Sequence, residues 1–489
     1  MKVFYENTGA DDMKTNRREF LTGAVLAGAA ISGGCATRDA GCAKAANGAV
    51  GVPMRNFTVV PMKKIRVGVV GCGARGTGAV KRLPKVPGVE VTAVCDVRDT
   101  YLQNAVAAVE KAAGRKPRAF GGSPEAWKAL CDWDGVDVVY NTTPWHLHAP
   151  VAVYAMKAGK HALIEVPSAM FIDECWELVD TAEKTRRHCM QLENCCYGED
   201  ELLALNLCTL GLLGELNHGE GAYIHDRRWQ IFNDSQWEAW RRRWNIEHSG
   251  NQYVTHGLGP IAFDMSINRG DRFDYLVSVD GEQRGYEAFA AATIPADDPR
   301  RAMRFKMADM NVTTIRTAKG RTIMLQHDVT SPRPYSRLNL IAGTKGVFRA
   351  WPKRDIFLEK EPPAKMSGHH KFDDAETERI RQEFMHPLFK TAGEIAKKVG
   401  GHGGMDYLMD LRWAYCLLNG LPLDADVYDL AAWCAVAELS ERSARNRSKA
   451  LDFPDFTRGA WKRECPCNLA NANIDLSKLP VDPSTAAKV

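Results

Sequence analysis

The sequence predicts an α/β protein, with an N-terminal doubly wound parallel sheet followed by an α+β domain that has a largely antiparallel sheet. Two observations predict this arrangement. First, short apolar runs alternate with helical segments over roughly residues 63–195, as in βαβ units. Second, strand-like segments then follow one another with turn signals between them, before helices return near the end. We therefore expect a separate N-terminal segment over 1–62, domains over 63–195 and 196–463, and a C-terminal tail over 464–489.

The composition is that of an ordinary globular chain. Its 489 residues are enough for more than one hydrophobic core, and 45% of them are hydrophobic and 25% charged. The formal net charge of +4 is small for this length, so the composition indicates no nucleic-acid partner. The 14 cysteines lack the paired C-x-x-C spacing of zinc sites. We expect most of them to be buried thiols, and we predict no metal site.

The first predicted strand runs directly into a glycine-rich turn. The β-branched stretch 65–70 is followed by Gly71-Cys-Gly73-Ala-Arg-Gly76, where a helical pattern begins. In such a unit Gly71 would allow the tight turn, and Gly73 would allow the backbone to approach a pyrophosphate closely. Gly76 would let the helix pack against the strand, with the helix N-terminus facing the anion. The segment therefore predicts a dinucleotide-binding Rossmann domain.

The second predicted strand ends at an acidic residue. The apolar run 89–95 is followed by Asp96, at the expected distance from the glycine-rich turn. A carboxylate at this point can bond both ribose hydroxyls and would repel a 2′-phosphate. The pattern therefore favours NAD over NADP as the cofactor.

Helices and strands continue to alternate through the rest of this domain, and Ser123-Pro124 is typical of a helix start. Two polar turns, 143–148 and 165–167, follow strands, which is where ligands bind in parallel sheets. The predicted helices cover 101–113, 148–158 and 173–184, and the predicted strands cover 135–140, 161–165 and 190–194.

The second predicted domain combines an antiparallel sheet with helices. Lys319-Gly320 predicts a turn between two neighbouring strands, which makes that pair antiparallel. We expect a substrate to bind at the junction of the two domains. The predicted strands cover 275–280, 311–316, 322–328, 337–342 and 346–351, and the predicted helices cover 199–212, 406–418 and 427–443.

The N-terminal segment has the pattern of an export signal. Arg17-Arg18 precedes an apolar run over 21–31 that is too short to span a bilayer. Paired arginines before such a run are typical of the twin-arginine route, and Cys35 is a candidate lipid-attachment residue. The prediction is an exported bacterial protein, either periplasmic or anchored as a lipoprotein. A cofactor regenerated within each turnover would suit that location, because no free NAD pool is expected outside the cytoplasm.

Several motifs resemble a known family. T-P-x-x-x-H at 143–148 and E-x-P at 165–167 resemble the glucose-fructose oxidoreductase / inositol dehydrogenase superfamily. Within it, the chain from about residue 63 to 463 is similar to glycoside hydrolase family 109, whose characterised activity is an NAD-dependent α-N-acetylgalactosaminidase. The motifs of this narrower resemblance are Glu165-Val166-Pro167, Glu193-Asn194-Cys195, Tyr253–Pro260, Arg269-Gly270-Asp271 and Pro454–Gly459.

The resemblance implies glycoside cleavage through a transient oxidation. The superfamily's dehydrogenases usually carry E-K-P, whereas the middle residue here is Val166, which cannot titrate. This weakens an ordinary sugar dehydrogenase mechanism and supports the narrower family. In the implied route, NAD oxidises carbon 3 of the sugar, a base removes the hydrogen on carbon 2, the glycosidic oxygen leaves, water adds and the hydride returns. The alternatives are a sugar oxidoreductase with tightly bound NAD(P) and a sugar-binding protein without activity.

The resemblance also implies which residues bind and react. His256 and Tyr253 are the candidate catalytic residues, and His256 is favoured as the base because imidazole titrates near neutral pH. His146 and His148 resemble a metal pair but lack a clear third ligand. The expected partners are a carbohydrate substrate and further copies of the chain in a homo-oligomer. The implied cofactor residues are Arg75, Gly76, Asp96, Trp145, His148, Glu165, Val166 and Asn194. The implied sugar-binding residues are Tyr223, Arg241, Tyr253, Val254, Thr255, His256 and Tyr335.

Overall fold

A computed structural model of the chain describes residues 51–233, 236–360 and 369–480. The chain divides into two units, Met1–Lys44 and Ala45–Val489, and everything described lies in the second. The predicted export arginines, Arg17 and Arg18, and the candidate lipid-attachment residue Cys35 lie outside the described residues. Within the described ranges, no helix is both long enough and apolar enough to cross a membrane.

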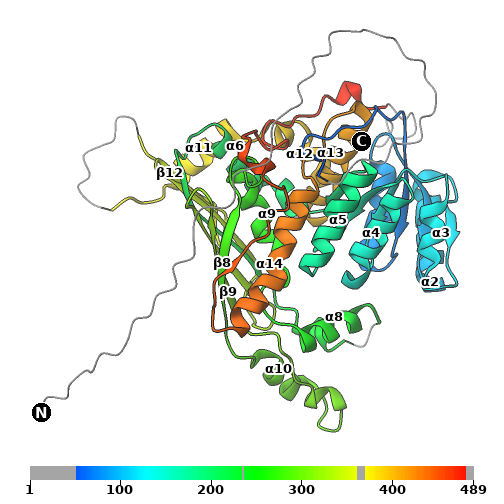
Figure 1. Ribbon diagram of the computed structural model, residues 1–489, viewed down its shortest axis with the longest axis horizontal. Coiled ribbons are helices and arrows are strands. Elements are labelled where there is room, and N and C mark those ends of the chain that lie inside the picture. The colour runs from blue at the N-terminus through cyan, green and yellow to red at the C-terminus, as the bar shows by residue number, and fades with distance from the viewer. Residues whose placement is uncertain (1–50, 234–235, 361–368, 481–489) are drawn as a thin grey trace, which may run out of the picture. The chain divides into compact units, whose positions relative to one another are not determined.

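The N-terminal part of the second unit is a six-stranded parallel sheet in the order β3-β2-β1-β4-β5-β6, which confirms the predicted doubly wound fold. Its helices α2 to α5 are labelled in Figure 1. The chain winds outward in both directions from β1, so the crevice between β1 and β4 is the switch point where such sheets bind ligands. The strands are β1 Ile65–Val70, β2 Val89–Cys95, β3 Arg118–Phe120, β4 Val138–Asn141, β5 His161–Ile164 and β6 Cys189–Gln191. The helices are α1 Ala74–Arg82, α2 Asp99–Ala113, α3 Ala126–Asp132, α4 His148–Lys157 and α5 Ile172–Thr185.

Strand β1 shows why this segment becomes a central strand. Side chains of successive residues point to opposite faces of a sheet, so a strand covered on both faces must be apolar throughout. Val67 and Val69 pack into the core on one face, and Val70 packs with Ala93 and Cys95 on the other. The continuous apolar run that predicted the strand is therefore a direct result of two-sided burial.

The second part is an eight-stranded sheet in the order β13-β12-β11-β7-β10-β9-β8-β14. Every neighbouring pair is antiparallel except β7 and β10, which agrees with the predicted, largely antiparallel sheet. The predicted turn at Lys319-Gly320 joins the antiparallel strands β9 and β10. The strands are β7 Leu216–Ile224, β8 Phe273–Asp280, β9 Asn311–Thr317, β10 Thr322–Asp328, β11 Ser336–Gly343, β12 Gly346–Arg349, β13 Asp355–Leu358 and β14 Leu451–Asp452.

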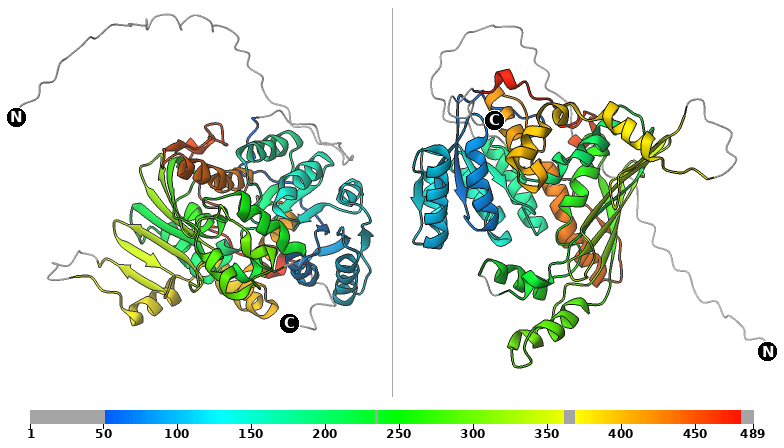
Figure 2. Two further views of the ribbon diagram at one scale, coloured as in Figure 1. Left: turned by 90° about the horizontal axis from the view of Figure 1, so that it is seen from below. Right: turned by 180° about the vertical axis from the view of Figure 1, so that it is seen from behind.

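Helices of the second part lie between its sheet and the first domain (Figures 1 and 2). Helix α14 packs against both α5 of the first domain and β8 of the large sheet, and its Trp433 is fully buried. The segment predicted as a C-terminal tail adds Cys467, Leu469 and Ile474 to the core. The helices are α6 Glu199–Thr209, α7 Arg228–Ile231, α8 Gln236–Glu247, α9 Thr255–Asp264, α10 Gly285–Thr293, α11 Asp374–Phe384, α12 Pro387–Val399, α13 Met405–Asn419 and α14 Val427–Arg445.

The central strand β7 was absent from the sequence prediction because it contains glycines where strands usually carry β-branched residues. Gly221 is required by a close approach, since a Cβ there would lie 2.6 Å from the carbonyl oxygen of Gly257 in α9. The candidate base His256 lies in the first turn of α9. The glycines of β7 thus bring the start of α9 against the sheet.

Candidate active site

A cleft of about 370 Å³ opens at the carboxyl ends of β1, β2, β4 and β5. The loop before α9 and helix α8 close its other side, so both domains line it. Gly76 and Asn194, which were also predicted to bind the cofactor, lie behind this surface and are buried. The predicted residues that line the cleft are Gly71, Gly73, Arg75, Asp96, Trp145, His148, Glu165, Val166, Arg241 and Tyr253.

The glycine-rich turn has the shape that a pyrophosphate requires. Gly71 has a φ of +88°, and a Cβ there would lie 2.9 Å from the backbone of Thr142, directly after the neighbouring strand β4. A Cβ on Gly76 would lie only 1.9 Å from the carbonyl oxygen of Gly71, so the helix can start here only with glycine at that position. A Cβ built on Gly73 would have no atom within 4 Å apart from those of its chain neighbours, so there is open space beside this residue. Gly73 is the N-cap residue of α1, and no side chain makes a capping hydrogen bond there. The free N–H groups and the helix dipole therefore suit a bound anion.

Asp96 follows β2 and has its carboxylate held in place by the backbone. Its Oδ2 accepts a hydrogen bond from the N–H of Cys72 at 2.7 Å, and its Oδ1 accepts one from the N–H of Arg98 at 2.8 Å. Each carboxylate oxygen has a second acceptor position. The carboxylate lines the cleft beside the glycine-rich turn, as ribose recognition requires.

A network of charges holds the inner end of the cleft. Arg75 donates to Glu165 Oε1 from Nε at 2.9 Å and from Nη2 at 2.6 Å, and its Nη1 lies 3.3 Å from Asp406 Oδ2. Asp406 also accepts from Asn194 Nδ2 at 2.6 Å and from Arg82 at 3.4 Å. Burial alone would raise the pKa of Asp406, but His402 and the two arginines hold it well below its ordinary value. Asp406 was not predicted from the sequence, because nothing local marks it.

Aromatic side chains form the wall between the cofactor cleft and the second domain. Trp145 is buried, with its ring centroid 4.9 Å from that of Trp240 and 5.8 Å from that of Tyr253. The Arg241 guanidinium lies 4.8 Å from the Trp145 ring centroid. Both ring nitrogens of His148 lie 2.7 Å from backbone carbonyl oxygens, Nδ1 from that of Pro167 and Nε2 from that of Thr143. These contacts connect the two polar turns, and neither nitrogen is left to bind a metal ion. Burial lowers the pKa of His148.

The second domain brings four of the predicted sugar-binding residues together. The Tyr253 ring centroid lies 4.4 Å from that of Tyr223 and 5.0 Å from that of His256. Tyr335 lies at the edge of the same group, 6.4 Å from Tyr223 between ring centroids. Burial raises the pKa of Tyr253 far above that of an ordinary tyrosine, with a further contribution from Tyr223. Its phenol therefore stays protonated at neutral pH and can donate a hydrogen bond.

Two predicted sugar-binding residues do not face this group. Val254 packs in the hydrophobic core, and the Thr255 side chain is completely buried. Their side chains are therefore part of the packing around α9, and neither lines the cleft. The resemblance covered the whole run from Tyr253 to His256, and it could not separate the two buried middle residues from the partly exposed residues at the ends.

Two histidines next to Tyr223 were missed. His225 Nδ1 lies 3.2 Å from the Tyr223 hydroxyl, and burial lowers the pKa of His225 to about 4. His327 stacks on Tyr223 from β10, and burial lowers its pKa to about 3. Both are neutral at physiological pH. His225 could have been found from the period of two along a strand, because it shares a face with Tyr223.

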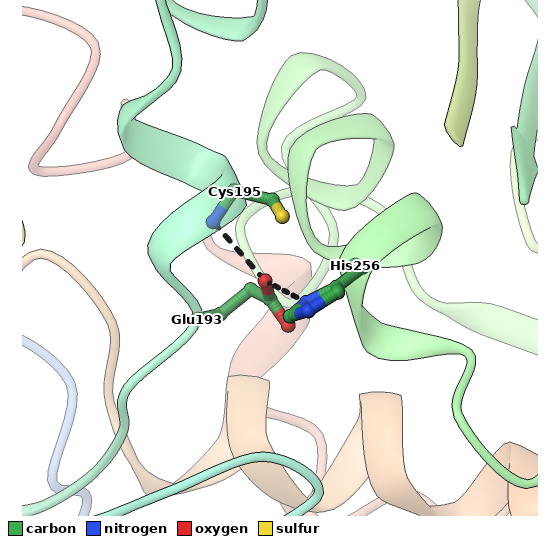
Figure 3. Close-up of side chains that lie close together, drawn as sticks. All are labelled: Glu193, Cys195 and His256. Atoms are coloured by element: carbon green, nitrogen blue, oxygen red, sulfur yellow. Dashed lines mark hydrogen bonds and ion pairs between the residues drawn. The ribbon is translucent and has the colours of Figure 1, made fainter. Parts of the chain in front are cut away.

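His256 and Glu193 form a pair at the inner end of the cluster (Figure 3). His256 Nδ1 lies 2.6 Å from Glu193 Oε1, and Figure 3 shows the two side chains reaching toward each other from α9 and from the turn after β6. Burial alone would raise the pKa of Glu193. The charge on His256 and the hydrogen bond that His256 donates instead lower this pKa below its ordinary value. Glu193 is therefore a carboxylate at neutral pH.

Cys195 lies close enough to this pair for the three side chains to offer metal ligands within 4.8 Å of one another. Two ligand atoms bound to one zinc ion at about 2.0–2.1 Å stand roughly 3.3 Å apart in a tetrahedral site. The 2.6 Å between Glu193 and His256 is shorter and fits a direct hydrogen bond. Burial also raises the pKa of the Cys195 thiol well above its ordinary value, which disfavours the thiolate that a metal would bind.

Comparison with known families gives two matches that together cover most of the described chain. Residues 197–463 match the model of the Glycosyl hydrolase 109, C-terminal domain. Residues 65–192 match the model of the Oxidoreductase family, NAD-binding Rossmann fold. The second match confirms NAD as the cofactor expected from the glycine-rich turn and Asp96.

Curated relatives are similar over nearly their whole length. A glycosyl hydrolase family 109 protein of Shewanella pealeana is 46% identical, with 94% of this chain and 99% of that protein covered. A protein of the same description from Shewanella woodyi is 47% identical, with 84% and 89% covered.

Solved structures share the fold at low identity. Levoglucosan dehydrogenase in complex with NADH and L-sorbose superposes with a TM-score of 0.61 at 18% identity, covering 80% of this chain and all of that one. An NAD binding oxidoreductase from Klebsiella pneumoniae also has a TM-score of 0.61, at 15% identity, with 81% and 100% covered. These similarities establish the fold.

Proposed function

The chain belongs to glycosyl hydrolase family 109, and from this premise we propose that it is an exported glycosidase that cleaves N-acetylgalactosaminides or related glycosides with no net oxidation. It is an enzyme of that family with an NAD-binding Rossmann domain. The observation that carries the proposal is the cluster of Tyr223, Tyr253 and His256 beside the cofactor cleft. In this cluster the candidate base His256 and the candidate hydrogen-bond donor Tyr253 lie next to each other, with their ring centroids 5.0 Å apart.

The protonation states of the residues indicate which of them accepts a proton and which donates a hydrogen bond. When bound, NAD supplies a reversible oxidation of the sugar, so the cofactor leaves the cycle unchanged. His256 is the base that removes the proton on carbon 2, because it keeps 14% of its side chain exposed and has a carboxylate behind it. Tyr253 stays protonated and donates to a sugar oxygen. Arg241 and Tyr335 supply further donors to hydroxyl groups.

Val166 supports hydrolysis over simple sugar oxidation. It is buried in the wall of the cleft next to Glu165, at the middle position of the E-x-P turn. A valine cannot accept the proton of a sugar hydroxyl, so this position offers no base for an ordinary dehydrogenase reaction. Glu165 is bonded to Arg75 and forms part of the cofactor end of the site.

Export is supported by the twin arginines of the N-terminal segment and by the recycling of the cofactor. The twin-arginine route carries folded proteins, so NAD can be loaded before export. Cys35 is proposed as the attachment point of a lipid anchor. Treatment of cells with a radiolabelled fatty acid would test this, because a Cys35→Ser variant should lose the label.

The test of the glycosidase proposal uses purified protein with no added NAD. Release of nitrophenol from the α-N-acetylgalactosaminide and related nitrophenyl glycosides is followed together with absorbance at the NADH band. The expected result is steady nitrophenol release without accumulating NADH, and a large fall in this rate to a residual level in His256→Ala. Accumulating NADH without nitrophenol would refute the proposal in favour of a sugar oxidoreductase.

A further inference from the structure

We infer that Glu193 is a positioning residue for His256, holding one tautomer and orientation of the imidazole so that its other nitrogen faces the substrate. The inference rests on the proposed function for the role of His256 as a base. It adds a residue that binds neither sugar nor cofactor and acts through His256 alone.

The contact itself has the features of a fixed carboxylate–imidazole pair. Glu193 Oε1 accepts from His256 Nδ1 at 2.6 Å, a short distance typical of hydrogen bonds between charged or partly charged groups. The Glu193 side chain is only 2% exposed, against 14% for that of His256. The carboxylate is therefore shielded from water, and the imidazole is the more exposed member of the pair. With Nδ1 bound to Glu193, Nε2 is the nitrogen left to take a proton.

The fold holds Glu193 in this position from its own side. Glu193 follows β6 and caps a short 3-10 helix, where Oε1 also accepts from the N–H of Cys195 at 3.2 Å (Figure 3). Gly259, three residues after His256, leaves room for the side chain, since a Cβ there would lie 3.0 Å from Glu193 Cγ. A larger residue at Gly259 would push the carboxylate away from α9.

The fold holds His256 from the opposite side. Gly257 lies against β7 so closely that a Cβ on it would stand 2.3 Å from the backbone nitrogen of Ala222. This contact fixes the first turn of α9, and His256 with it, relative to the large sheet. The pair thus connects the last strand of the parallel sheet to a helix seated on the antiparallel sheet.

Glu193 is the only anion among the described titratable groups that face His256. The others are Tyr223 on β7, His225 directly after β7, Tyr253 before α9, and Cys195 beside Glu193. Burial raises the pKa of Tyr253 and Cys195, and it lowers the pKa of His225 to about 4, so these three are neutral near pH 7. The carboxylate of Glu193 is therefore the group that stabilises His256 when it carries the abstracted proton.

The test compares Glu193→Ala and Glu193→Gln with a matched control. Glu183 is equally buried and is bonded to Tyr428 and Arg458, away from the cleft, so Glu183→Ala reports the cost of losing a buried glutamate. We expect Glu193→Ala to lower kcat about 10²-fold, the low end of what general acid–base catalysis contributes, with little change in KM. Glu193→Gln keeps the acceptor and should restore part of kcat, with the acid limb of the pH–rate profile moved to lower pH. Glu183→Ala should lower Tm and leave kcat in place.

A double variant and a spectroscopic measurement make the outcome decisive. If Glu193 acts through His256, Glu193→Ala should cost nothing further in a His256→Ala background. The same additional loss in both backgrounds would overturn the inference. The 15N shifts of the His256 ring, assigned by the signal missing in His256→Ala, should report Nδ1–H in the wild type and a mixture of tautomers in Glu193→Ala. This measurement does not depend on enzymatic activity, so it separates the two proposals. If the wild type is inactive and Glu193→Ala leaves the 15N shifts unchanged, both the glycosidase activity and the role of Glu193 are refuted. If the wild type is inactive but the shifts change as expected, only the glycosidase activity is refuted.

Discussion

Replacing Asp406 by asparagine tests the charge network that holds the inner end of the cofactor cleft. The change keeps the shape of the side chain and removes the charge that Arg75, Arg82 and Asn194 share. Breaking one partner of a buried ion pair typically costs 3–5 kcal/mol. We expect about 3 kcal/mol, the low end of that range, because Arg75 keeps Glu165 and Arg82 keeps Asp410 at 2.6 Å.

The sign of the pH dependence follows from the direction of the shift. The pKa of Asp406 is held well below its ordinary value in the folded protein, so its stabilisation is present above the unfolded value of about 4. That stabilisation is lost as the pH falls toward the lower folded pKa. Wild type and Asp406→Asn should therefore differ most near neutral pH and converge in acid.

Thermal unfolding and NAD titration measure the outcome. A loss of about 3 kcal/mol in a cooperative unit of several hundred residues lowers Tm by roughly 3 °C. We also expect weaker NAD binding, because Arg75, which lines the cleft, loses one of its two carboxylate partners. Asp374→Asn is the control, since Asp374 forms an exposed pair with Lys353 and should change stability by less than about 0.5 kcal/mol. An Asp406→Asn protein with wild-type Tm and wild-type NAD affinity would show that the network is not coupled to the site.

Three further predictions concern the cleft. Gly76→Ala should abolish NAD binding, measured by quenching of protein fluorescence, because the new Cβ would lie 1.9 Å from the carbonyl oxygen of Gly71; retained binding would mean that the turn can move. Asp96→Ser should weaken NAD binding roughly tenfold, which is the equivalent of one hydrogen bond to a charged group. It should also reduce the protein's preference for NAD over NADP. Unchanged affinities for both cofactors would show that Asp96 does not bind the ribose. Tyr253→Phe should lower kcat for nitrophenyl glycoside cleavage about 10²-fold with the fold intact, as judged by an unchanged Tm, and full activity would exclude the phenol as a donor.

Much of the cofactor half of the site follows from short stretches of sequence. The turn from Gly71 to Gly76 lies within one strand–turn–helix unit, and its geometry depends on glycine at positions that only a few neighbouring residues determine. Asp96 follows from the same unit, because a parallel strand must end at the same edge of the sheet. The resemblance to the family added Trp145, Glu165 and the second-domain residues, and the match over 197–463 confirms that family.

The rest of the site depends on contacts between distant parts of the chain. Glu193 and His256 are 63 residues apart, and Arg75 and Asp406 are 331 apart, so no local period relates them. Strand β7 was missed because Gly221 has a low strand propensity. The glycine is needed there because α9 packs closely against it. Local sequence thus predicted most strands of the parallel sheet and the glycine-rich turn, which depend on neighbouring residues. The tertiary structure alone decided which polar groups are buried together, because the free energy of a buried charge depends on the partner that the fold brings to it.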